Sequence, residues 1–287
     1  MGEQRADGPR ERIERATERM GERRDAAVER MGERRDGAVE AMATARGNPA
    51  DAVASAKENT AEAVASAKAS AAEAIAKIKP KLRGVSHEWA FFLSLGLGAA
   101  LIVAAEGAKA TVAVAIYTVS LSALFGVSAL YHRITWRPEV RVWMRRLDHT
   151  MIFLLIAGTI TPFALLVLEG GFAKALLICV WGAALGGIVV ELIWVEAPKW
   201  LAAILYVAVG LIGAVAYPEI VSKAGIGAGI LIAAGGALYI TGAVIYAVER
   251  PDPNPAVFGY HEIFHVLVIA AAGAHFAAIA FFALPAA

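Results

Sequence analysis

The sequence predicts an all-α polytopic membrane protein, in which a seven-transmembrane-helix bundle follows a charged helical N-terminal extension. The chain has 287 residues, of which 58% are hydrophobic and 18% are charged, so it is more apolar than an average soluble domain. Its charges are unevenly distributed, because residues 1–83 contain 32 of the 53 charged residues. We therefore expect two domains, a charged extension over 1–83 and a membrane domain over 84–287.

The composition also excludes several classes of protein. Lys and Arg number 27 and Asp and Glu number 26, and the resulting net charge of +1 is not the basic excess of a nucleic-acid-binding protein. Cys179 is the single cysteine, which rules out an intramolecular disulfide framework and a cysteine-rich zinc module. Any metal ion would therefore be held by His, Asp or Glu side chains.

The extension contains an eleven-residue repeat. MGERRD occurs at 20–25 and 31–36, and AVASAK occurs at 52–57 and 63–68. Eleven residues make about three helical turns, so the repeated Met and Val side chains fall on one face of a helix. The pattern fits an amphipathic helix pair, broken at 47–49, that lies on the inner membrane surface or self-associates. It also fits a solvated, alanine-rich extension with no such role.

Seven apolar segments of the membrane domain are long enough to cross a hydrocarbon core of ~30 Å, which takes about 20 helical residues. Turn-forming or charged residues separate them, among them Glu169-Gly170-Gly171 and Pro218-Glu219. The predicted spans are 88–105, 110–131, 150–168, 172–195, 200–217, 226–248 and 261–284.

Basic residues predict the orientation of these spans, because they concentrate in short cytoplasmic loops. The segment between the second and third spans carries half of the basic residues of the membrane domain, namely Arg133, Arg137, Arg141, Arg145 and Arg146. Residues 1–40 contain no apolar run of signal-peptide length, which agrees with a cytoplasmic extension. We therefore predict a multi-pass protein of the inner (cytoplasmic) membrane, with its N-terminus in the cytoplasm and its C-terminus outside.

Polar residues that suit metal chemistry occur at the predicted cytoplasmic ends of three spans. Ser128 and His132 lie four residues apart near the end of the second span, and Asp148 precedes the third. His261 and His265 lie four residues apart at the start of the seventh. Residues four apart share a helix face, and ionisable side chains within spans usually face the bundle interior. We therefore expect these five residues to converge at one membrane depth.

Three histidines with a water in the fourth position form the ligand set of a catalytic zinc site. We predict that His132, His261 and His265 hold Zn²⁺. Asp148 would then orient the water or accept its proton, and Ser128 would polarise a substrate carbonyl or support the site, as metal-assisted hydrolysis requires. Taken singly, a histidine pair at a helix end also fits a hydrated interface, and Asp148 also fits a charge that favours the helix dipole.

Four further polar residues have open roles. His149 is assigned to the surroundings of the site or to the membrane interface, and His275 lies too deep for the same ion. His87 is either near the site or hydrated. Glu191 either lies at the interface or lines the site.

Three motifs are shared with a known family: FGVSALYHR at 125–133, RRLDHTMIFLLIAGTITPFAL at 145–165 and YHEIFHV at 260–266. The sequence resembles the hemolysin III family, the bacterial branch of the progestin and adipoQ receptor group, over about residues 84–284. The resemblance implies seven helices, a cytoplasmic N-terminus and a zinc ion near the cytoplasmic face. It implies that the zinc ligands are His132, His261 and His265. It also implies that Asp148 contacts the zinc-bound water and that Ser128 corresponds to the serine of the family motif. The repeat extension is not part of the family pattern.

The resemblance leaves two functions open. The wider superfamily includes alkaline ceramidases, which implies hydrolysis of a lipid amide or sensing of the membrane lipid state. Bacterial members are named for haemolysis, which implies a pore-forming protein in which zinc is purely structural. We expect membrane lipids to be the partners in both cases, and no nucleic acid.

Overall fold

The computed structural model describes residues 32, 35–37, 49–76, 80–194 and 196–286. Over these residues the protein is all-helical and has no strand beyond an isolated bridge between Asn254 and Phe258, which confirms the predicted all-α class. The chain divides into two compact units, Met1–Ala74 and Ile75–Ala287.

Helix α2 (Pro49–Ala76) is the longest described part of the extension and has 28 residues. Pro49 suits the first helical position, where its missing N–H would lack an intrahelical partner in any case. Val53 and Val64, which belong to the repeated apolar face, are exposed. The other repeat positions Met20, Met31 and Met42 lie outside the described residues, so the amphipathic role of the extension stays a prediction.

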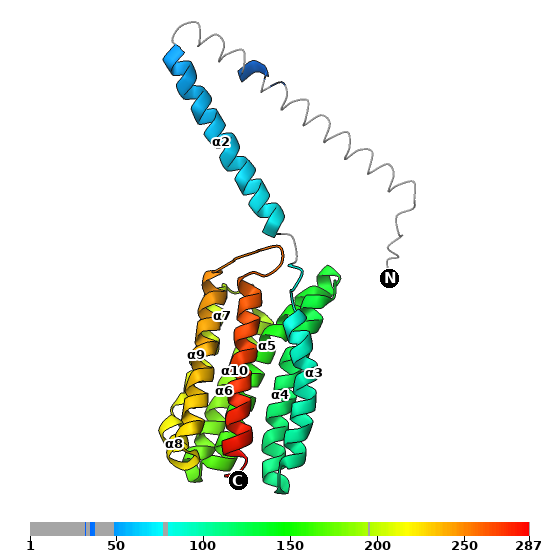
Figure 1. The fold of residues 1–287 in the computed structure, drawn as a ribbon, viewed down its shortest axis with the longest axis vertical. Coiled ribbons are helices and arrows are strands. Elements are labelled where there is room, and N and C mark those ends of the chain that lie inside the picture. The colour runs from blue at the N-terminus through cyan, green and yellow to red at the C-terminus, as the bar shows by residue number, and fades with distance from the viewer. Residues whose placement is uncertain (1–31, 33–34, 38–48, 77–79, 195, 287) are drawn as a thin grey trace, which may run out of the picture. The chain divides into compact units, whose positions relative to one another are not determined.

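The described residues of the membrane unit form six helices that are long and apolar enough to cross a membrane, or seven spans if the bent pair α7 and α8 forms one (Figure 1). In chain order the elements are α3 (Val85–Ala104), α4 (Gly107–Arg133), α5 (Pro138–Pro162), η1 (Phe163–Val167), α6 (Gly170–Ile193), α7 (Lys199–Ala214), α8 (Tyr217–Ala224), α9 (Ile226–Val248), α10 (Tyr260–Ala278) and η2 (Ile279–Ala283). The two π-helices η1 and η2 directly continue α5 and α10.

Two of the predicted boundaries are wrong. The arginine-rich segment is not a loop, because α5 already begins at Pro138 and carries Arg141, Arg145 and Arg146. The apolar pattern marks only the later part of this helix, whereas its first three turns carry all of its Asp, Glu and Arg residues. The fifth span is also not one straight helix, because α7 ends at Ala214 and α8 follows at an angle of 47°. Pro218 there starts a helix instead of a turn.

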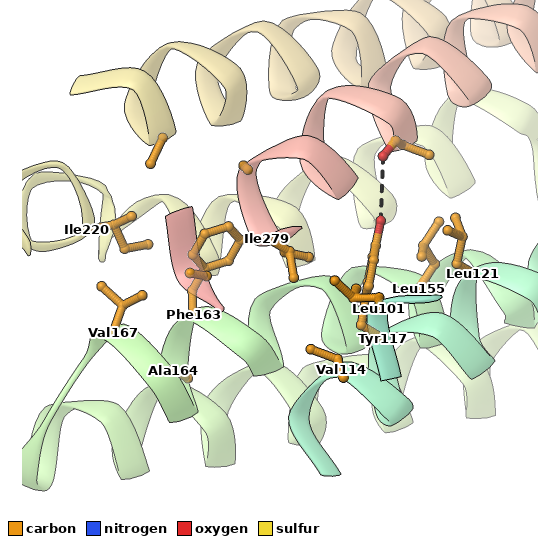
Figure 2. Close-up of a cluster of buried hydrophobic side chains, with 14 of the residues drawn as sticks. Leu101, Val114, Tyr117, Leu121, Leu155, Phe163, Ala164, Val167, Ile220 and Ile279 are labelled. Atoms are coloured by element: carbon orange, nitrogen blue, oxygen red, sulfur yellow. Dashed lines mark hydrogen bonds between the residues drawn. The ribbon is translucent and has the colours of Figure 1, made fainter. Parts of the chain in front are cut away.

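The first and last membrane helices are neighbours, because α10 packs against α3 as well as against α9. The beginnings of α3 and α10 therefore lie at one end of the bundle together with the end of α4 (Figure 1). A buried apolar cluster that includes Leu121, Phe163 and Ile279 fills the space between α4, α5 and α10 (Figure 2). Within it the Tyr117 hydroxyl donates a long hydrogen bond of 3.5 Å to the carbonyl of Ala272 (Figure 2).

Candidate metal centre

Two helix ends bring three histidines together. His132 lies in the last turn of α4, and His261 and His265 lie in the first two turns of α10. Their candidate ligand nitrogens all lie within 4.8 Å of one another, although 129 residues separate His132 from His261. His132 and His265 are buried and His261 is partly buried. We call this group the histidine cluster.

The spacing of one nitrogen pair in the histidine cluster fits a zinc ion. The Nε2 atoms of His132 and His261 are 3.2 Å apart. Two nitrogens at about 2.0–2.1 Å from one tetrahedral zinc are separated by about 3.3 Å. The Nδ1 atom of His265 is buried and has no hydrogen-bond partner among the described residues. A nitrogen that binds a metal ion is expected to have no hydrogen-bond partner within the protein. The donor set of three imidazoles also suits zinc chemically.

Asp148 lies beside the histidine cluster on a third helix. Its Oδ2 is 3.6 Å from the Nε2 of His132, which is too long for a direct hydrogen bond. Ser128, one turn before His132 in α4, is buried. Asp148 and Ser128 line a cavity of about 40 Å³ together with His261 and His265. All five predicted site residues therefore meet at one end of the bundle, and their chemical roles remain predictions.

Gly84 makes room for His132 at the start of α3. Its φ of 79° lies in the left-handed region, which a residue with a side chain rarely adopts. A Cβ atom at this position would be 2.6 Å from the Cβ of His132. A glycine at the N-cap of α3 thus allows this backbone to approach the histidine cluster closely.

An ion pair and two backbone hydrogen bonds hold the segment before α3 against the start of α10. The Arg83 guanidinium pairs with the carboxylate of Glu262, which is 2% exposed. The N–H groups of Lys81 and Leu82 donate to the carbonyls of residues 256 and 257 at 3.1 and 3.2 Å. Sequence analysis missed Glu262, although a Glu three residues after an N-cap at Gly259 is a capping pattern.

The structure gives the positions of three of the four polar residues whose roles the sequence left open. His87 is buried beside the histidine cluster. Glu191 is 3% exposed and lies inside the bundle, where its carboxylate accepts from the Tyr206 hydroxyl at 2.9 Å. His149 is also partly buried, with Nδ1 3.2 Å from the other oxygen of Glu191.

His275 lies away from the histidine cluster, as expected, and its Nε2 is 3.2 Å from the Ile232 carbonyl. It lines a second cavity of about 650 Å³, whose walls are mostly apolar. Six residues line both this cavity and the small one: Leu124, Ile152, Tyr206, Ala243, Phe264 and Val268. The large cavity therefore adjoins the small one at the histidine cluster.

Lys199 joins three helices near the same end of the bundle, a role that sequence analysis did not anticipate. Its ammonium donates to the Tyr260 hydroxyl at 2.7 Å and to the Glu249 carboxylate at 2.9 Å. It also lies 5.7 Å from the centre of the Tyr246 ring, which in turn contacts His261 edge-on. α7, α9 and α10 are thereby fastened together next to the histidine cluster.

Comparison with known proteins extends these observations. Residues 75–276 match the sequence model of a family described as Haemolysin-III related. Hemolysin-3 of Bacillus cereus is 34% identical over 213 residues, which cover 70% of this chain and 94% of the relative. The Hemolysin-3 homolog of Bacillus subtilis is 33% identical over 168 residues, which cover 58% of this chain and 75% of the relative.

A more distant relative comes from animals. The human monocyte to macrophage differentiation factor is 27% identical over 168 residues, which cover 57% of this chain and 67% of the relative. The family match includes every residue of the histidine cluster, together with Asp148 and Ser128. The chain belongs to the haemolysin-III-related family of multi-pass membrane proteins.

Proposed function

We propose that this protein is a zinc-dependent hydrolase of membrane lipids, and that it acts on an amide bond. The observation that supports this function best is the shared wall between the small cavity at the histidine cluster and the apolar cavity of about 650 Å³. Ligand pockets typically enclose about 300–1,000 Å³, with mostly apolar walls and a few polar groups at one end. A lipid tail in the large cavity would place its linkage group at the histidines.

Each residue of the site has a definite task in this proposal. His132, His261 and His265 hold the zinc ion, which activates a water molecule and polarises a carbonyl oxygen when bound. The Asp148 carboxylate accepts a proton from the attacking water and holds it at Oδ2 for the leaving amine. The Ser128 hydroxyl donates a hydrogen bond to the carbonyl oxygen.

The apolar residues of the large cavity would bind the lipid tail and exclude bulk water. Burial of a CH₂ group contributes about 0.8 kcal/mol, so a long chain would supply most of the binding energy. The same arrangement would serve a sensor that binds a lipid without turnover. In the orientation that we propose, the site faces the cytoplasm and the N-terminus is cytoplasmic.

The name of the Bacillus cereus relative, Hemolysin-3, favours a second candidate function. In this alternative the protein forms a pore and zinc only clamps α4 to α10. The alternative predicts conductance in planar bilayers and lysis of red cells. If neither occurs at high protein dose, the pore is excluded.

Metal analysis and a lipid assay test the proposal together. We expect about one zinc per chain in the purified wild type and strongly reduced zinc in a His261→Ala/His265→Ala double variant. Unchanged zinc in the double variant would remove the metal centre. A zinc-loaded protein that cleaves no ceramide or other acyl amide in a broad lipid panel, and whose His132→Ala variant keeps its cellular phenotype, would exclude catalysis.

A further inference from the structure

His87 lies beside the histidine cluster in a fixed orientation. It belongs to the first turn of α3 and is 2% exposed. Its ring stacks on that of His265, with the centroids 3.8 Å apart and the planes 9° from parallel. The Phe125 ring meets it at 5.1 Å in an edge contact. Packing from α4 and α10 therefore holds this imidazole in place.

The protein itself leaves the polar atoms of His87 unsatisfied. Both ring nitrogens are buried, and neither has a hydrogen-bond partner in the described part of the chain. Unpaired buried polar groups are rare in native proteins and usually have a water, an ion or a ligand as partner. His87 lines the small cavity of about 40 Å³, and a single water needs only about 10–15 Å³ of such space. The partner of His87 is therefore expected inside that cavity.

The ring stacking argues against His87 as a fourth zinc ligand. An imidazole binds a metal ion through the lone pair of a ring nitrogen, so the ion lies in the plane of the ring. The rings of His87 and His265 are almost parallel and 3.8 Å apart. The stacked rings of His265 and His87 would therefore not both direct a nitrogen lone pair at one ion.

The small cavity is lined by both acceptor and donor groups. Asp148, an acceptor when ionised, lies beside His132, whereas His87 lies against His265. A neutral imidazole always carries one N–H that can donate. An oxygen atom in the cavity could therefore receive a hydrogen bond from His87 while Asp148 accepts from another group.

We propose that His87 contacts the substrate: its ring N–H donates a hydrogen bond to the carbonyl oxygen of the scissile bond. This inference rests on the proposed metal centre and adds a residue of α3 to it. A fixed donor at this oxygen stabilises the negative charge that develops there during attack by water. Small oxygen ligands that bind at the histidine cluster should depend on the same donor.

The experiment measures ligand binding and not turnover. Full-length protein in detergent is loaded with Co²⁺ and titrated with acetohydroxamate. The absorption spectrum of Co²⁺ reports its coordination, whereas Zn²⁺ gives no such signal. His87→Phe keeps an aromatic ring for stacking but removes both nitrogens, and His87→Gln restores an N–H. Ser94→Ala is the control, because it removes a buried polar group of α3 whose Oγ is 2.9 Å from the Oγ of Ser122.

We expect His87→Phe to bind Co²⁺ normally, with an unchanged spectrum before titration, and to bind acetohydroxamate about tenfold or more weakly, as for the loss of a hydrogen bond to a charged group. His87→Gln should recover part of this loss, and Ser94→Ala should match the wild type.

Unchanged acetohydroxamate affinity in both His87 variants would overturn this inference and leave the metal centre intact. Loss of Co²⁺, or an altered spectrum without acetohydroxamate, in a folded His87→Gln protein would identify His87 as a metal ligand and would also overturn it. A wild type that binds no Co²⁺ would refute the metal centre itself, and this inference with it.

Discussion

Arg83 and Glu262 form an ion pair that joins the residue before Gly84 to the first turn of α10. The second carboxylate oxygen of Glu262 accepts from the N–H of Gly259 at 2.8 Å, so the same side chain also caps α10. His261 adjoins Glu262 in the chain. The ion pair therefore helps to fix the helix start that carries two residues of the histidine cluster.

Removal of the positive partner of this pair should cost more stability than removal of the negative one. Arg83→Gln leaves the buried carboxylate of Glu262 uncompensated, which costs about 3–5 kcal/mol. Glu262→Gln keeps an acceptor for Gly259 and leaves Arg83, whose side chain is 21% exposed, in contact with water. Thermal unfolding in detergent measures the difference. Equal losses in the two variants would contradict this account of the pair.

Substitution of Gly84 should weaken metal binding as well as stability. Gly84→Ala combines a left-handed backbone, which costs about 1–2 kcal/mol for other residues, with a Cβ that would be 2.6 Å from His132. Gly107→Ala is a matched control, because Gly107 has the same φ of 79° and no atom within 4 Å of the added Cβ. We expect both variants to be destabilised and only Gly84→Ala to bind zinc more weakly. Normal zinc affinity in Gly84→Ala would show that the cluster tolerates a shift of His132.

The hydroxyl of Tyr206 should contribute more to stability than that of Tyr117. Tyr206→Phe removes one of the two hydrogen-bond partners of the buried carboxylate of Glu191, at a cost of about 1–3 kcal/mol. Tyr117→Phe removes only a bond of 3.5 Å to a backbone carbonyl, so its cost should be smaller. Unfolding temperatures of the two variants provide the comparison, and a larger loss for Tyr117→Phe would reverse the interpretation.

A bulky side chain at position 236, in place of Gly236, should reduce the length of the longest lipid tail that the protein binds. Gly236 lines the large cavity, and an added Cβ would have no atom within 4 Å. Gly182 on α6 has equally open surroundings but does not line this cavity, so Gly182→Phe is the control. Native mass spectrometry with lipids of graded tail length should show long-chain binding lost in Gly236→Phe and kept in Gly182→Phe. Retention of long chains in both variants would place the lipid elsewhere.

Local sequence patterns predicted the convergence of the candidate site, because two i, i+4 pairs at helix ends restrict where their side chains can point. They also predicted the apolar spans. The same patterns could not show that α5 begins at Pro138, since hydropathy marks apolar segments and not helical structure in turns that carry charged residues. The bend between α7 and α8 was missed for a related reason: Pro218 fits a turn and a helix start equally well.

Long-range contacts lie beyond such patterns. Arg83 and Glu262 are 179 residues apart, and Glu191 reaches His149 from a different helix. None of these pairings can be predicted when each segment is considered alone. Only the packing of α10 against α3, and of α6 against α5, brings the partners together.

The position of the histidine cluster at the neighbouring ends of α4 and α10 has a consequence for biosynthesis. α10 leaves the ribosome after the other membrane helices described here, and it brings two of the three imidazoles. A chain with its earlier spans already inserted carries just one of them. A metal ion held as proposed would therefore be bound only late in assembly, and a chain truncated before residue 260 would lack two of the three candidate ligands.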